Sequence, residues 1–153
     1  MASSIRFAHT NLVARDWRRL ARFYVDVFAC TPVGPERDLS GRWLDEAVGL
    51  EGARIRGVHL LLPGHGGRGP SLEIFAYSPE AHAEPPAANR PGFGHIAFSV
   101  EDVGTMHRRA LEAGGSPAGK IVTRPIPGAG TITFAYLRDP EGNLVELQRW
   151  SDP

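Results

Sequence analysis

A short pattern occurs twice in this chain, and this repetition constrains the fold more than any other feature. The stretch FAHTNLVARDW begins at Phe7, and FGHIAFSVEDV begins at Phe93; each has a His two positions after the Phe and an Asp seven positions after the His. The offset between the copies is constant, because 95 − 9 and 102 − 16 both equal 86. A constant offset indicates two similar units in tandem.

Each copy predicts a strand followed by a helix. Residues 5–14 and 92–100 have the length and alternation of strands. Asp16 and Asp102 then suit helix N-caps. The two expected helices carry apolar stripes at steps of three and four residues, formed by Trp17, Leu20, Ala21, Tyr24, Val27 and Phe28 and by Val103, Met106, Ala110 and Leu111.

The second half of each copy predicts a pair of strands. Residues 54–64 and 70–79 flank the turn GHGGRG, and residues 131–150 form two strands around the turn RDPEGN. The predicted fold is therefore α+β, with two tandem βαβββ modules in one domain, 1–153. Module one spans 1–78, a linker rich in Pro and Ala spans 79–91, and module two spans 92–153. Residues 34–56 are expected to form a loop with a helical turn near 44–48.

Composition argues against several classes of protein. Lys+Arg and Asp+Glu are equal at 17 each, whereas nucleic-acid-binding proteins usually carry a basic excess. No segment approaches the roughly 18 apolar residues of a membrane helix, and the N-terminus lacks the features of a signal peptide. Cys30 is the single cysteine, so no intramolecular disulfide can form, which suits a reducing cytoplasm. We expect Cys30 to be a small buried hydrophobe.

Each module has one His in its first strand and one Glu in its last, namely His9 with Glu73 and His95 with Glu146. A charged Glu between apolar strand neighbours needs a partner, a proton or a metal. Two imidazoles and two carboxylates that converge suit one divalent ion such as Zn, Ni, Co, Fe or Mn. The alternative is a pair of buried ion pairs without metal, which would contribute little net stability.

Other polar residues have weaker indications. His59 lies in a strand and is a candidate for a supporting role beside the ligands, whereas His107 is expected at the surface of the second helix. Further residues that are candidates to line the site are Asn11, Ser99, Tyr136, Gln148 and Trp150.

The segments IRFAHTNLVARDWRRLARFYVDVF, GHIAFSVEDV and LRDPEGNLVELQ resemble the vicinal oxygen chelate superfamily, which includes glyoxalase I, methylmalonyl-CoA epimerase, extradiol dioxygenases and resistance proteins. The resemblance implies a curved mixed sheet around a metal cup, with the ligand positions on His9, Glu73, His95 and Glu146. It also implies a small-molecule substrate with vicinal oxygens, and a homodimer.

The set of two His and two Glu resembles bacterial glyoxalase I. That resemblance implies a metal-dependent isomerase or lyase that removes a proton next to a carbonyl through an enediolate, with Glu146 as the first candidate for the base and Glu73 as the second. Extradiol dioxygenases use three ligands, which would be His9, His95 and Glu146 here. A non-catalytic binding or resistance protein is the remaining alternative.

Overall fold

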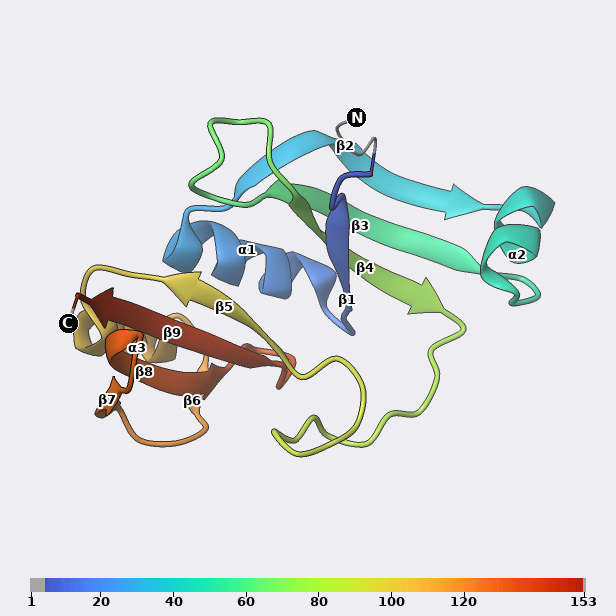
Figure 1. Ribbon diagram of the computed structural model, residues 1–153. Helices are drawn as coiled ribbons and strands as arrows, with labels where there is room; N and C mark the ends of the chain where they lie inside the picture. The colour runs from blue at the N-terminus through green and yellow to red at the C-terminus, as the bar shows by residue number, and fades with distance from the viewer. Residues whose placement is uncertain (1–4, 153) are drawn as a thin grey trace. The chain divides into compact units, whose positions relative to one another are not determined.

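The computed structural model describes residues 5–152. The first four residues, which belong to the N-terminal stretch considered above for a signal peptide, lie outside this range. The chain divides into two compact units, Met1–His82 and Ala83–Pro153, so the division falls within the predicted linker. Each unit contains one mixed sheet, and Figure 1 labels its strands and helices. The α+β class and the two tandem βαβββ modules are confirmed.

The first unit contains four strands in the order β1-β4-β3-β2. Strand β1 is parallel to β4, and the other pairs are antiparallel. The elements of this unit are β1 (His9–Val13), α1 (Trp17–Phe28), β2 (Thr31–Ser40), α2 (Arg42–Val48), β3 (Arg54–Leu61) and β4 (Ser71–Ser78).

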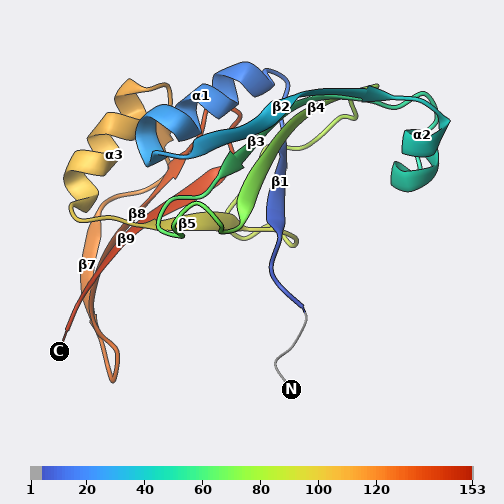
Figure 2. The ribbon, with the colours of Figure 1, turned by 90° about the horizontal axis from the view of Figure 1, so that it is seen from above.

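Helix α1 begins and packs as its sequence pattern predicts. The Asp16 side chain accepts a hydrogen bond from the Arg19 backbone N–H, and the helix ends at Phe28 before Ala29, whose φ is 55°. All six residues of the predicted stripe are buried. Helix α1 contacts β3 and β4, so its stripe packs on the buried side chains of these strands, such as Leu60, Leu72 and Ile74. One face of the sheet is thus covered by α1 (Figure 2).

The loop expected over residues 34–56 is wrong in part, because strand β2 runs from Thr31 to Ser40. This strand contains Pro32 and Pro35, which argue against a strand from sequence, and most of its side chains are exposed, so no alternation appears. Its edge position tolerates both prolines, since one side of the strand carries no ladder. A register shift between Val33 and Arg37 accommodates Pro35. The expected helical turn is confirmed as α2.

The second unit repeats the arrangement with a sheet in the order β5-β9-β8-β6, while β7 also pairs with β8. Strand β5 is parallel to β9, as β1 is to β4. The Asp102 side chain accepts from the Thr105 backbone N–H and caps the helix. The elements are β5 (His95–Ser99), α3 (Val103–Glu112), β6 (Ser116–Pro117), β7 (Val122–Ile126), β8 (Gly130–Arg138) and β9 (Leu144–Ser151).

The turn RDPEGN is held by a buried carboxylate. Asp139 is 3% exposed and accepts hydrogen bonds from the backbone N–H groups of Glu141 and Asn143 and from the Asn143 side-chain amide. The Asp139 N–H donates to the Asn143 carbonyl at 2.9 Å, which closes the hairpin. The predicted strand pair around this turn is confirmed as β8 and β9.

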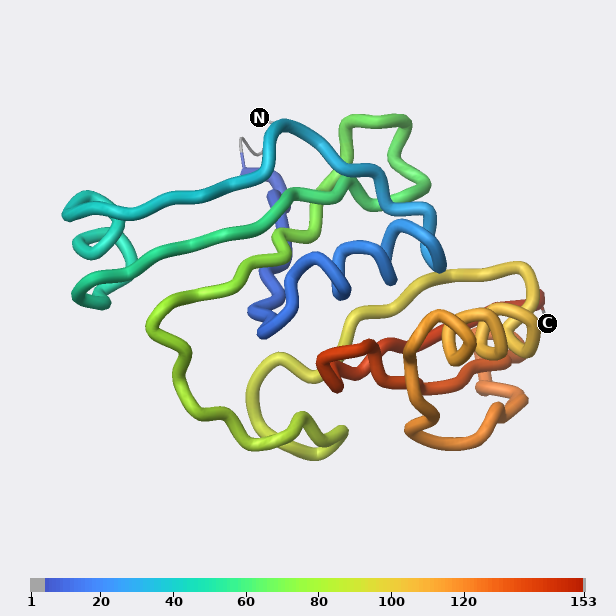
Figure 3. Tube along the Cα trace, turned by 180° about the vertical axis from the view of Figure 1, so that it is seen from behind, coloured from blue at the N-terminus to red at the C-terminus, as the bar shows by residue number. Residues whose placement is uncertain are grey.

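The connection between the units has no regular element from Pro79 to Gly94 and can be followed in Figure 3. No helix within residues 5–152 has the length and apolar content needed to cross a membrane.

Candidate functional site

His9 and Glu73 are brought together by the parallel pair β1 and β4. The His9 Nε2 lies 3.3 Å from the Glu73 Oε2. Side chains alternate across a strand, so Glu73 lies on the face opposite to Leu72 and Ile74, which pack with α1. The Glu73 side chain is 14% exposed and that of His9 is 46% exposed. A mostly covered carboxylate thus meets an accessible imidazole.

Glu73 has two further polar neighbours, one on each flanking strand. Asn11 of β1 and His59 of β3 are both its register partners. The Asn11 amide donates to Glu73 Oε2 at 3.5 Å, and the His59 Nε2 lies 3.5 Å from Glu73 Oε1. Both carboxylate oxygens therefore have a nitrogen close by. The register, not the sequence pattern, reveals this cluster.

His59 lies between Glu73 and an aromatic ring. Its imidazole and the Phe75 ring are 5.5 Å apart at an angle of 60°. The Phe75 ring can lie against β3 because residue 57 is Gly, since a Cβ there would overlap the Ile74 carbonyl oxygen and the Phe75 ring. Burial lowers the pKa of His59 below its ordinary value of 6.5, although the Glu73 carboxylate opposes this. The neutral imidazole is favoured.

The second unit contains the equivalent pair on β5 and β9. The His95 Nε2 lies 3.0 Å from the Glu146 Oε2, and the two side chains are 38% and 12% exposed. Tyr136 of β8, the register partner of Glu146, donates its hydroxyl to Glu146 Oε2 at 3.5 Å. Its ring meets the His95 imidazole edge to face at 5.0 Å. Burial, and then the Glu146 charge, raise the pKa of Tyr136.

The spacing within each pair suits two ligands of one metal ion. Zinc is bound by His nitrogen and carboxylate oxygen at about 2.1 Å, so two such ligands at tetrahedral or octahedral angles are roughly 3.0–3.4 Å apart. The pairs His9–Glu73 and His95–Glu146 have separations of 3.3 and 3.0 Å. Within residues 5–152, no group of three or more His, Cys, Asp or Glu side chains is arranged to hold a metal. Each unit therefore presents a pair of candidate ligands.

Three further residues named from the sequence lie near these strands. Gln148 accepts a hydrogen bond from the Trp150 indole N–H at 3.1 Å, so these two side chains engage each other. Ser99 is exposed and is the register partner of Gln148.

Cys30 is buried as expected, and burial raises the pKa of its thiol to about 12, which leaves it unreactive.

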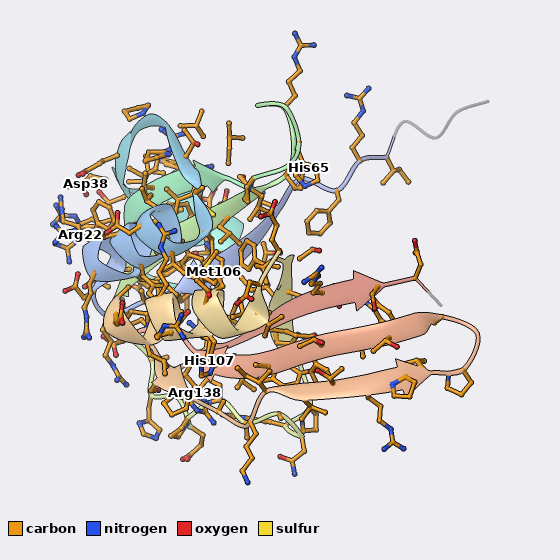
Figure 4. All side chains as sticks on the ribbon, turned by 90° about the vertical axis from the view of Figure 1, so that its left-hand side faces the viewer. Arg22, Asp38, His65, Met106, His107 and Arg138 are labelled. Carbon is orange, nitrogen blue, oxygen red and sulfur yellow. The ribbon has the colours of Figure 1, made fainter. Side chains whose placement is uncertain are left out.

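The expectation that His107 lies at the surface is wrong. His107 is half-buried on α3, and its Nε2 is buried without a hydrogen-bond partner among the described residues. It lies four residues after Val103 and three before Ala110, both buried, so the same periodicity that predicts the stripe also includes it. Figure 4 labels it together with His65, which lies exposed in the Gly-rich turn of the first unit.

Comparison with known proteins gives a match over nearly the whole chain. A family model described as Glyoxalase/Bleomycin resistance protein/Dioxygenase superfamily matches residues 6–147. A probable lactoylglutathione lyase from Synechocystis sp. is 40% identical over 57 residues, which are 37% of this chain and 40% of that protein. A lactoylglutathione lyase from Arabidopsis thaliana is 38% identical over 66 residues, which are 40% of this chain and 21% of that protein. The chain spans less than half the length of these curated relatives.

Solved structures share the fold. A glyoxalase family protein from Bacillus cereus has a TM-score of 0.81 at 21% identity, with 98% of both chains covered. A genomically encoded fosfomycin resistance protein from Listeria monocytogenes, solved with Mn(II) and sulfate, has a TM-score of 0.53 at 16% identity, with 99% of this chain and 95% of that chain covered. At these identities the likeness establishes the fold.

Proposed function

Because this chain belongs to the Glyoxalase/Bleomycin resistance protein/Dioxygenase superfamily, we propose that it is a divalent-metal-dependent isomerase or lyase acting next to a carbonyl. The observation that carries this proposal is the repeated His–Glu pair, with N–O separations of 3.3 and 3.0 Å at equivalent positions of the two units. Glyoxalase-like relatives named lactoylglutathione lyase support the same class.

The ligands in this proposal are His9, Glu73, His95 and Glu146, and the metal is Ni, Co, Zn, Fe or Mn. When bound, the ion acts as a Lewis acid for the substrate oxygens and for the negative charge that develops on an enediolate. The fosfomycin resistance protein solved with Mn(II) supports a divalent ion in this fold. The substrate is a small molecule with vicinal oxygens.

Glu146 is the proposed base, and Glu73 is the second candidate. The Glu146 side chain is only 12% exposed and has His95 and Tyr136 as its polar neighbours. A carboxylate in such surroundings can take a proton from the carbon next to the carbonyl, and the Tyr136 hydroxyl can hold the carboxyl group in place. Glu73 has three polar neighbours, which approach both of its oxygens, and therefore suits a fixed ligand better than a base.

A second candidate function is a dioxygenase with three ligands, His9, His95 and Glu146. One observation favours it: Asn11 and His59 give Glu73 polar partners that require no metal. A Glu73→Gln variant distinguishes the two functions, because it should retain full metal content and activity under the three-ligand scheme and lose both under the four-ligand scheme. Oxygen consumption with a catechol would then be the activity to measure.

The first test combines metal content with proton exchange. Mass spectrometry should find about one divalent ion per chain in the wild type, and less in a His95→Ala variant. Glu146→Gln should then abolish exchange of the substrate proton with deuterium, followed by NMR on 2-oxoaldehyde thiohemiacetals and 2-substituted acyl thioesters. A Glu112→Gln variant, exposed on α3, is the matched control and should exchange normally. Retained exchange in Glu146→Gln would contradict its assignment as the base.

A homodimer in the cytoplasm completes the proposal. The buried Cys30 needs no oxidising compartment, which supports the location. Light scattering after size exclusion should give a mass near twice the 16.6 kDa of the chain, and a mass of one chain would contradict the dimer.

A further inference from the structure

The two carboxylates have different neighbours at equivalent register positions. On the antiparallel side, Glu73 pairs with His59 and Glu146 pairs with Tyr136. On the parallel side, Glu73 pairs with Asn11 and Glu146 pairs with Ala97. Beyond the paired His of each unit, Glu73 therefore has a polar register partner on both flanking strands, whereas Glu146 has one only on β8.

The polar neighbours of Glu73 divide between its two oxygens. His9 and Asn11 approach Oε2, at 3.3 and 3.5 Å, whereas His59 approaches Oε1 at 3.5 Å. A carboxylate that gives one oxygen to a metal has the other oxygen free to accept a hydrogen bond. The His59 Nε2 is positioned beside that other oxygen.

His59 is well restrained for such a role. It lies on β3, which is flanked by β2 and β4, and its side chain is 24% exposed against 46% for His9. The Phe75 ring lies 5.5 Å from the imidazole and packs over Gly57. A side chain held by a ring and by its strand loses little further rotamer freedom when it donates a hydrogen bond.

We infer that His59 is a positioning residue for Glu73: its Nε2–H holds Oε1 and leaves Oε2 for the metal beside His9. This inference rests on the metal centre of the proposed function. Partners that orient a ligating group typically change metal affinity 10–100-fold when they are removed. The inferred role is not that of a ligand, since His59 faces the oxygen that His9 does not.

Three variants test this role. His59→Leu removes the donor and keeps a similar volume, whereas His59→Gln keeps an amide N–H near the position of Nε2. His65→Gln, in the exposed Gly-rich turn, is the matched control. The dissociation constant for Zn²⁺ is measured by competition with a chromogenic chelator, and the visible absorption spectrum of the Co²⁺ form reports ligand geometry. Circular dichroism confirms that each variant folds, and His59→Asn replaces the Leu variant if that one does not.

For His59→Leu we expect a 10–100-fold larger dissociation constant for Zn²⁺ and an altered Co²⁺ spectrum. The affinity for Zn²⁺ should be close to wild type in His59→Gln and unchanged in His65→Gln. Wild-type affinity for Zn²⁺ in His59→Leu would overturn this inference but leave the proposed function standing. Equal, larger losses in both His59 variants would also overturn it, because His59 would then be a ligand. A wild-type protein that binds no divalent ion would overturn the proposed function, and this inference with it.

Discussion

Asp139 is the one buried charged side chain among the described residues, and its role is structural. Replacing it by Ala leaves the backbone N–H groups of Glu141 and Asn143 without their acceptor. Orphaned buried donors cost roughly 1–3 kcal/mol each, so Asp139→Ala should lower the free energy of unfolding by about 3 kcal/mol. Urea denaturation measures this loss.

The matched variant for this prediction is Asp139→Asn, which keeps one acceptor oxygen and should lose less stability than Ala. Equal losses in the two variants would contradict the hydrogen-bond account, because only the charge would then matter.

The four candidate ligands could be predicted from sequence because one His and one Glu recur at equivalent positions of the two repeats. The roles of His59 and Tyr136 depend on register, which the spacing alone left open. The signal was present in the turns: counting outward from Leu62 and Pro70 pairs His59 with Glu73, and counting from Asp139 and Asn143 pairs Tyr136 with Glu146. Strand pairing had to be known before those counts had meaning.

At the scale of the element, the N-cap of α3 makes a pH-dependent contribution to stability. The hydrogen bond from the Thr105 N–H lowers the pKa of Asp102 below its ordinary value of 3.8. A lowered folded-state pKa means that the contribution is present above the unfolded pKa and is lost as pH falls through the folded pKa. Wild type should therefore lose thermal stability relative to Asp102→Asn below about pH 4, since Asn caps without titrating.

Melting temperatures of the two proteins, recorded side by side from neutral to acidic pH, check this prediction. Parallel curves through the acidic range would mean that the Asp102 charge does not contribute to the cap.

Among the elements, helices were easier to predict than the edge strand. The stripe of α1 and both Asp caps follow from local spacing, which acts within one turn of helix. Strand β2 escaped prediction because its pairing to β3 comes from tertiary structure and overrides the poor β-propensity of Pro32, Gly34 and Pro35. Intrinsic β-propensity is thus a poor guide to an edge strand, whose formation depends on hydrogen bonds to a single neighbouring strand.

At the scale of the molecule, a shared metal would couple the stability of the two units. A ligand at 100 times its dissociation constant stabilises the native state by about 2.7 kcal/mol. If one ion takes ligands from both units, His9→Ala and His95→Ala should each lose most of that increment. Calorimetry with and without the metal measures it. An effect confined to one of the two variants would assign the metal to a single His–Glu pair.

The two hairpins of this fold tolerate changes of length very differently. The nine residues from Leu62 to Pro70 form an open connection rich in Gly, whereas Asp139 ties its own turn to Asn143 through backbone and side chain. Side chains alternate along a strand, so a one-residue deletion between Asp139 and Asn143 that slipped the pairing would rotate Glu146 onto the face where Val145 and Leu147 are buried. Insertions and deletions should therefore accumulate between β3 and β4 during evolution, while the turn from β8 to β9 keeps its length.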